Sequence, residues 1–202
     1  MSAEEALGVV LAGGASRRMG FDKSALEVAG RSLVVRTSEV LAPVCAEVVV
    51  SIQPGAGWDD DSLKPIGDLR SRAGPLAGLE AALMGEGASG RAVFLLACDL
   101  PLVGTEVVEH ILSAAEHSPD SAAVVPLLAE RTQPLCGLYR PRALAVAQEH
   151  LDAGRRSMHE LLAALPVATV PIDEDLPFFR PDLFHNLNEP GDLEALLGAS
   201  SP

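Results

Sequence analysis

Hydrophobic and polar positions follow two patterns along most of this 202-residue chain. Continuous apolar runs are typical of strands buried on both faces of a sheet, and they occur at residues 6–11, 47–52, 92–97, 122–125 and 168–172. Apolar residues with helical spacing occur at residues 33–41, 77–84, 105–115, 141–151, 157–164 and 192–197. Pro141 suits the first position of its helix, and Thr105 is predicted to cap another.

The order of these elements indicates the class of fold. Strands that alternate with helices, and that are apolar along their whole length, predict an α/β protein with three layers, α/β/α, and a mostly parallel central sheet. No internal repeat or low-complexity linker interrupts the chain, so we expect residues 1–202 to form a single domain. Ligands of such folds bind at the carboxyl ends of the strands. The loops that begin at Leu11 and Cys98 should therefore form the site.

Composition narrows the range of partners. The formal net charge is -13, and because an acidic protein repels the phosphate backbone, we expect no nucleic acid partner. The three cysteines, Cys45, Cys98 and Cys136, lack the spacing of a disulfide framework or a zinc site. No apolar stretch approaches the ~20 residues of a membrane helix, and Glu4 and Glu5 stand where a signal peptide would carry basic residues. These observations favour a cytoplasmic protein with no membrane partner.

The loop after the first predicted strand has the composition of a phosphate-binding turn. Gly13 and Gly14 allow the backbone to approach a ligand closely and to point N–H groups at phosphate oxygens. Arg17, Arg18 and Lys23 add positive charge beside them. The spacing fits neither a Walker loop nor a dinucleotide-binding turn. On glycines and charges alone, an ordinary strand-to-helix turn with exposed basic residues explains the segment equally well.

A carboxylate follows the third strong apolar run. Asp99 comes after residues 92–97 and Cys98, and an acid next to a buried strand is costly unless it binds something. Magnesium bound to a nucleoside triphosphate prefers one or two carboxylates together with phosphate oxygens and water. Alternatively Asp99 could cap the next helix, although Thr105 is better placed for that. We therefore predict Asp99 as a magnesium ligand and Cys98 as a small buried residue.

The complete first loop reads LAGGASRRMGFDK from Leu11 to Lys23. This ordered pattern resembles the signature loop of the nucleotidyltransferases that make nucleotide-linked cofactors and sugars, and most of all that of the molybdenum cofactor guanylyltransferases. The resemblance covers nearly the whole chain and implies a Rossmann-like nucleotidyltransferase fold, with nucleotide binding in the N-terminal half and acceptor binding in the C-terminal half. It implies that the loop wraps the triphosphate of a nucleotide. Leu11, Ala12 and Gly13 would contact the nucleotide, and Gly14, Arg17 and Lys23 would lie on the phosphate side.

Three further positions match the nucleotide side of that family. An aspartate at the place of Asp68 contacts the nucleotide in the family, and the GPLAG segment that ends at Gly78 lines the nucleotide pocket. Ser51 stands where the family often has asparagine, so we include it as a nucleotide-binding position. Without the resemblance, Asp68 would be an ordinary loop aspartate and the GPLAG segment a plain turn into a helix.

The acceptor is expected to bind the second half of the chain. The QPL segment at Gln133 is similar to one on the pterin side of the family's cleft. Two arginines precede Ser157 at a predicted helix start, which suits the phosphate of an acceptor, although such pairs are more often solvated surface. The segment NLNEP resembles the family's N-x-N-T-P motif, with a glutamate in place of threonine. The predicted acceptor-binding residues are Gln133, Arg156, Ser157, Asn186 and Asn188.

Together these features imply a magnesium-dependent guanylyltransferase. In the family, the terminal phosphate of molybdenum-bound molybdopterin attacks the α-phosphorus of GTP and pyrophosphate leaves. A phosphate monoester needs no general base, so positioning and charge neutralisation by Lys23, Arg17 and Asp99 would supply the catalysis. A molybdoenzyme or a cofactor-insertion protein would receive the product. Two alternatives remain open: transfer of another nucleotide, to the same pterin or to a sugar phosphate, and a non-catalytic protein that binds nucleotide or pterin.

Overall fold

The computed structural model describes residues 6–12, 27–28, 31–55, 58, 62–85 and 90–187. Within these ranges eight strands form the main sheet, namely β1 (Leu7–Leu11), β4 (Glu47–Ile52), β5 (Lys64–Gly67), β6 (Val93–Ala97), β7 (Ala123–Leu128), β8 (Arg131–Thr132), β9 (Cys136–Tyr139) and β10 (Val167–Pro171). Their order is β10-β7-β9-β6-β1-β4-β5, and β8 pairs with β7. A separate hairpin consists of β2 (Glu27–Val28) and β3 (Arg31–Ser32).

The centre of the sheet is parallel. β1 lies between β4 and β6, with Val9 opposite both Val49 and Leu95. Every residue of β1 and of β6 is buried, as expected for strands that are covered on both faces. β5 and β10 also run parallel to their neighbours, whereas β9 is antiparallel to both β6 and β7. The sheet is therefore mostly parallel, as predicted, and β9 begins at the edge where β6 ends.

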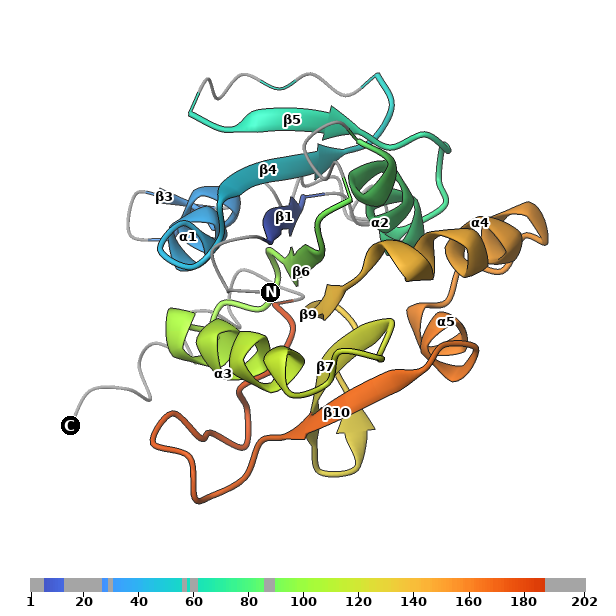
Figure 1. The fold of residues 1–202 in the computed structure, drawn as a ribbon. Helices are drawn as coiled ribbons and strands as arrows, with labels where there is room; N and C mark the ends of the chain where they lie inside the picture. Colours follow the sequence, from blue (N-terminus) through green and yellow to red (C-terminus); the bar gives the residue numbers. More distant parts are fainter. Residues whose placement is uncertain are drawn as a thin grey trace.

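Helices cover both faces of the sheet. They are α1 (Leu33–Leu41), α2 (Pro75–Met84), α3 (Thr105–Glu116), α4 (Leu144–Asp152), which follows the 3-10 turn η4 (Pro141–Ala143), and α5 (Met158–Ala163). On one face α1 packs on β1 and β4, and α3 packs on β7 and β9. On the other face α2 packs on the β1–β4 side of the sheet, while α4 packs on α2 and contacts α5 (Figure 1). The predicted α/β/α layering is confirmed. None of the helices in the described ranges is long and apolar enough to cross a bilayer.

Most predicted elements have close counterparts. The helix 33–41 and the strand 47–52 have the predicted bounds, but α2 begins at Pro75, two residues before its predicted start. The helix predicted from residue 141 begins as a 3-10 turn. β5 and β9 have no counterpart among the predictions, because runs of four mixed residues show no clear period. The predicted helix 192–197 lies outside the described residues.

The predicted cap at Thr105 is wrong. The N-cap of α3 is Gly104, which has no side chain to form a capping hydrogen bond. Thr105 is the first helical residue. The Thr105 hydroxyl donates instead to the Val40 carbonyl in α1, at 3.0 Å. Glu106 supplies negative charge in the first turn of α3, where the helix dipole favours it. Thr105 therefore joins two helices on one face of the sheet.

Candidate active site

The carboxyl ends of β1, β4, β5 and β6 lie at one edge of the sheet, because these strands are all parallel (Figure 1). The Ala12 N–H donates to the Ser51 carbonyl at 3.2 Å, and the Cys98 N–H donates to the Leu11 carbonyl at 3.3 Å. The Asp68 N–H, just after β5, donates to the carbonyl of Ile52, the last residue of β4, at 2.9 Å. These bonds hold the loops together at the edge where open α/β sheets bind ligands.

Ser51, Asp68 and Gly78 lie together on the predicted nucleotide side of this edge. Ser51, which is 2% exposed, donates from its hydroxyl to Asp68 Oδ1 at 2.6 Å. A Cβ on Gly78 would lie 2.6 Å from Ser51 Oγ and 2.8 Å from Leu11 Cδ2. A glycine is therefore needed for the first turns of α2 to approach the strand ends this closely. The sequence did not indicate the bond between Ser51 and Asp68, because no periodic pattern relates their positions.

The electrostatic environment of Asp68 has two opposing parts. Burial raises the pKa of the Asp68 carboxyl above its ordinary value, and the hydrogen bond from Ser51 acts against this by lowering it. Ser51 therefore helps to keep Asp68 ionised. An ionised carboxylate at this position can accept hydrogen bonds from the N–H groups of a base or the hydroxyls of a ribose.

Asp99 directly follows the Cys98 residue that ends the buried run of β6. Its Oδ1 is buried, and its carbonyl accepts a hydrogen bond from the Leu187 N–H at 2.9 Å. This bond brings the described part of the predicted asparagine motif against Asp99, and Asn186 is exposed beside it. Cys98 is 5% exposed, in agreement with its predicted role as a small buried residue.

Asp99 has the donor chemistry that a magnesium ion uses. Magnesium in nucleotide sites usually takes one or two carboxylates and completes its coordination with phosphate oxygens and water. Asp99 offers a carboxylate at the end of a central parallel strand, next to Cys98, whose N–H donates to the Leu11 carbonyl. Within the described ranges, no three His, Cys, Asp or Glu side chains are grouped so that they could hold a metal ion.

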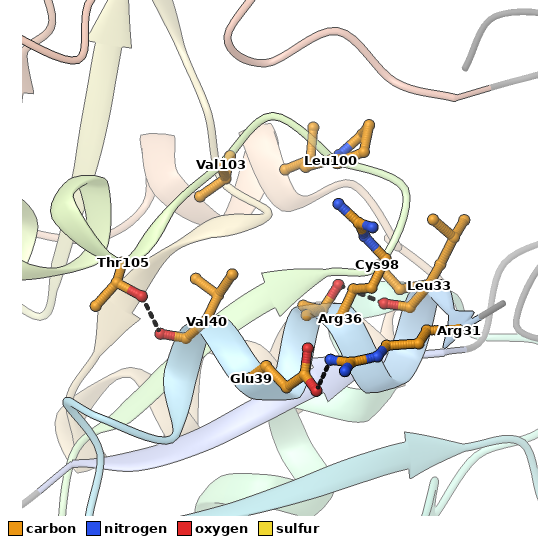
Figure 2. Close-up of a pocket in the computed structure, with 11 residues that line it drawn as sticks. Arg31, Leu33, Arg36, Glu39, Val40, Cys98, Leu100, Val103 and Thr105 are labelled. Carbon is orange, nitrogen blue, oxygen red and sulfur yellow. Dashed lines mark hydrogen bonds and ion pairs between the residues drawn. The ribbon is translucent and has the colours of Figure 1, made fainter. Parts of the chain in front are cut away.

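A pocket of about 460 Å³ opens between α1 and the segment that follows Asp99 (Figure 2). Two arginines line it together with apolar side chains. Arg31 is paired with Glu39 at 2.6 Å, along the exposed side of α1. Arg36 lines the pocket as well, and it adds a cation on the face of the sheet opposite α2. The apolar lining consists of Leu33, Val40, Cys98, Leu100, Pro101 and Val103.

The predicted acceptor segment at Gln133 leads into β9. The Leu135 carbonyl accepts from the N–H of the last residue of β6 at 2.9 Å, so the segment runs beside the strand that leads to Asp99. Tyr139 is fully buried in β9, and its hydroxyl donates to the Pro134 carbonyl at 2.6 Å. The tyrosine therefore fixes the turn that carries Gln133. Sequence reasoning missed this role, since one tyrosine in a short strand gives no signal.

The segment between α4 and α5 reaches the same edge, because α4 follows the antiparallel strand β9 and returns toward the carboxyl ends. The Arg156 guanidinium donates to the Arg72 carbonyl at 2.9 Å, and Arg72 lies in the loop that follows Asp68. Ser157 is the N-cap of α5, as predicted, and accepts from the Glu160 N–H at 3.3 Å. The two predicted halves of the site therefore touch across the loop after β5.

The structure brings most of the predicted site residues to this edge. The residues found along it are Leu11, Ala12, Ser51, Asp68, Gly78, Asp99, Gln133, Arg156, Ser157 and Asn186. Five others lie outside the described residues, namely Gly13, Gly14, Arg17, Lys23 and Asn188. Their predicted roles stay predictions.

Solved structures share this fold. Molybdopterin-guanine dinucleotide biosynthesis protein A from Archaeoglobus fulgidus matches with a TM-score of 0.75 and 24% identity, over 96% of this chain and 100% of that one. The 2-C-methyl-D-erythritol 4-phosphate cytidylyltransferase from Thermus thermophilus matches with a TM-score of 0.65 and 23% identity, over 94% and 98%. The chain therefore has the fold of these two proteins.

The sequence defines the family more narrowly. Residues 8–170 match the MobA-like NTP transferase domain. The molybdenum cofactor guanylyltransferase of Desulfosudis oleivorans is 33% identical over 193 residues, which are 93% of this chain and 92% of that protein. The probable molybdenum cofactor guanylyltransferase of Opitutus terrae is 38% identical over 160 residues, 78% of each chain. This chain belongs to the MobA-like NTP transferase family, and the resemblance seen in its first loop is confirmed.

Proposed function

We propose that this protein transfers GMP from GTP to the terminal phosphate of molybdenum-bound molybdopterin, and thereby forms the guanine dinucleotide form of the molybdenum cofactor. The observation that carries the proposal is the identity to relatives named molybdenum cofactor guanylyltransferase, which extends over nearly the whole chain. The geometry agrees with it, because the segments predicted for nucleotide and acceptor meet at one edge of the sheet.

The nucleotide would bind over the ends of β1, β4 and β5. Gly78 leaves room for a close approach of α2 to the strand ends, and the Asp68 carboxylate, supported by Ser51, is available to a hydrogen-bond donor of the nucleoside. The first loop would bind the triphosphate through its backbone N–H groups and through Arg17 and Lys23.

A magnesium ion would be held by Asp99. When bound, it would neutralise charge on the triphosphate and fix the geometry of the phosphates. The bond from Leu187 to the Asp99 carbonyl anchors the C-terminal segment against this position. The two asparagines of that segment, Asn186 and Asn188, are therefore proposed to contact the acceptor from the side of Asp99.

The chemical step needs little from the protein beyond positioning. An oxygen of the acceptor phosphate forms a bond to the α-phosphorus of GTP, the bond from that phosphorus to the β-phosphate oxygen breaks, and pyrophosphate leaves with the electron pair. A phosphate monoester is already anionic near neutral pH, so no general base is required. Gln133 and Arg156 would orient the acceptor in line with the leaving group, which is the largest contribution that positioning can make.

The test is a comparison of substrates. Pyrophosphate release is measured with GTP, CTP, ATP and UTP, each with magnesium and molybdenum-loaded molybdopterin, and the pterin product is identified by mass. We expect release with GTP that depends on the acceptor and on magnesium. Preference for CTP, or turnover only with a sugar phosphate as acceptor, would contradict the proposal. Binding of GTP without any turnover would identify a non-catalytic protein.

A further inference from the structure

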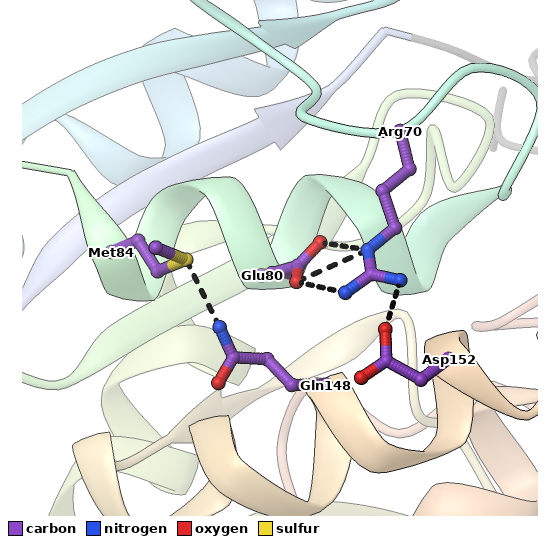
Figure 3. A network of polar contacts seen from close by, with 5 residues as sticks. All are labelled: Arg70, Glu80, Met84, Gln148 and Asp152. Atoms are coloured by element: carbon purple, nitrogen blue, oxygen red, sulfur yellow. Dashed lines mark hydrogen bonds and ion pairs between the residues drawn. The ribbon is translucent and has the colours of Figure 1, made fainter.

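Arg70 is the centre of a polar network that connects three parts of the molecule (Figure 3). It lies two residues after Asp68, in the loop between β5 and α2. Its guanidinium donates from Nε to Glu80 Oε2 at 2.9 Å and from Nη2 to Glu80 Oε1 at 3.0 Å. Its third nitrogen, Nη1, donates to Asp152 Oδ1 at 2.6 Å. The Arg70 side chain therefore connects the loop between β5 and α2, which carries Asp68, to α2 itself and to the last residue of α4.

The two carboxylates of the network differ in exposure. The Glu80 side chain is 2% exposed and Asp152 is 70% exposed. A buried carboxylate needs a partner with good geometry, and the bidentate fork of an arginine supplies one. The hydrogen bond to Glu80, and after it the one to Asp152, raises the pKa of Arg70 above its ordinary value. Glu80 therefore fixes Arg70 firmly, while Asp152 adds a contact at the surface.

A second contact also joins the loop between β5 and α2 to the segment at the end of α4. Arg156, which follows α4, donates to the Arg72 carbonyl at 2.9 Å. Arg72 has a φ of 56°, in the left-handed region that a long side chain rarely adopts. Such a conformation persists where the surroundings determine it. Here the loop is held by the contacts of Arg70 with Glu80 and Asp152 and by the hydrogen bond from Arg156. The loop 68–74 thus carries Asp68 at one end and contacts the predicted acceptor residue Arg156 near the other.

We infer that Arg70 is a positioning residue that couples the nucleotide site to the acceptor site. Through Glu80 it fixes the loop that presents Asp68 to the nucleotide. Through Asp152 it fixes the end of α4, from which the chain continues directly to Arg156. The inference rests on the proposed function for the identity of the two ligands, while the network itself is a feature of this chain.

Substitutions at the Arg70–Asp152 pair and at Arg70 itself should have different effects. In Asp152→Asn the buried pair remains and only the charged link to α4 is weakened. We expect the KM for the acceptor to rise about twofold to fivefold, in the range of an exposed ion pair, with an unchanged Kd for GTP. Arg70→Lys keeps the charge but loses the fork. For this variant we expect both constants to rise, each about threefold to tenfold, with kcat changed less than either.

Gln148→Ala is the matched control. Gln148 donates to the Met84 sulfur at 3.2 Å, in the same contact between α2 and α4 but away from the loop (Figure 3). This variant loosens the contact between α2 and α4 without changing Arg70. The KM for the acceptor and the Kd for GTP should therefore stay at the values of the unaltered protein. Thermal unfolding is followed for all variants, and because Asp152 is exposed, Asp152→Asn keeps the test valid even where Arg70→Lys folds poorly.

The experiment measures GTP binding by calorimetry and acceptor dependence by pyrophosphate release. The coupling is supported if Asp152→Asn changes only the acceptor constant and Gln148→Ala changes neither. It is overturned if Asp152→Asn leaves the acceptor KM unchanged, or if Gln148→Ala raises it equally, since the network would then only support the packing of two helices. An unaltered protein that does not use GTP would overturn the proposed function instead. The same comparison, made with the nucleotide that it does use, would still decide the coupling.

Discussion

The two sides of the carboxyl edge are built in different ways. The nucleotide side consists of strand ends and the start of α2, packed so closely that Gly78 has no room for a Cβ. The acceptor side consists of a turn before β9 and the segment between α4 and α5, where Arg156 is exposed and binds a backbone carbonyl. The part of the site predicted for the nucleotide is therefore built on the core, whereas the residues predicted for the acceptor lie on loops. A fold of this kind can change its acceptor without disturbing its core.

Removal of the charge at Asp99 should have the largest effect, because both sides meet there. Asp99→Asn keeps the shape of the side chain, and we expect kcat to fall at least about 100-fold, as for the loss of one preorganised electrostatic contact. Lys23→Ala should cause a loss of similar size. Pyrophosphate release measures both variants. Glu109→Gln, an exposed position on α3, is the control, and near-normal turnover by Asp99→Asn would remove Asp99 from the proposed mechanism.

Gly78→Ala tests the close packing of the nucleotide side. The new methyl group would meet Ser51 Oγ at 2.6 Å and Leu11 Cδ2 at 2.8 Å, so we expect a stability loss of about 1–3 kcal/mol. The displacement of Ser51 should also weaken GTP binding, and calorimetry with GTP and magnesium measures this. Gly67→Ala is the matched control at the same edge, because a Cβ there meets nothing within 4 Å. Equal effects of the two substitutions would show that the contact at Gly78 is unimportant.

Tyr139→Phe tests the acceptor side. It removes the donor from the buried Pro134 carbonyl, which should cost about 1–3 kcal/mol in the free energy of unfolding, or a fall in Tm of roughly 2–4 °C for each kcal/mol in a chain of this size. The turn at Gln133 should become less fixed, so the KM for the acceptor should rise while the Kd for GTP is unchanged. Denaturant unfolding and steady-state kinetics check the two parts. A change in GTP binding instead would show that the two sides are not separate.

Ser51→Ala should have the smallest effect at neutral pH. The Ser51 hydroxyl lowers a pKa that burial of Asp68 raises, so its removal should move the pKa of Asp68 further up. If ionised Asp68 binds the nucleotide, kcat/KM for GTP falls as the pH drops through this pKa. The acidic limb of the pH profile should therefore move to higher pH in the variant. An unshifted limb would mean that the ionisation of Asp68 does not govern GTP use.

Much of the nucleotide side could be predicted from the sequence. Leu11 ends one apolar run and Asp99 follows another, and in a parallel sheet all strands of that kind end at one edge. Asp68 was predicted from the family resemblance, because β5 has no clear apolar pattern. The glycines of the first loop and the resemblance of the GPLAG segment predicted places where the backbone approaches a ligand. The acceptor side could be predicted only as separate segments, because Gln133, Arg156 and Asn186 belong to short elements with no period.

The α/β/α class, the bounds of α1 and β4 and the family could all be predicted from the amino-acid sequence, because they depend on local periodicity and on an ordered motif. Three contacts became known only from the folded chain: Ser51 supports Asp68, Tyr139 fixes the turn before β9, and Arg70 connects α2 with α4. Such contacts join residues that no local pattern relates, and whether they form depends on how the strands are ordered in the sheet. The antiparallel strand β9, which the apolar pattern did not reveal, begins at the edge where Asp99 lies and runs away from it, and α4 therefore returns the chain to that edge.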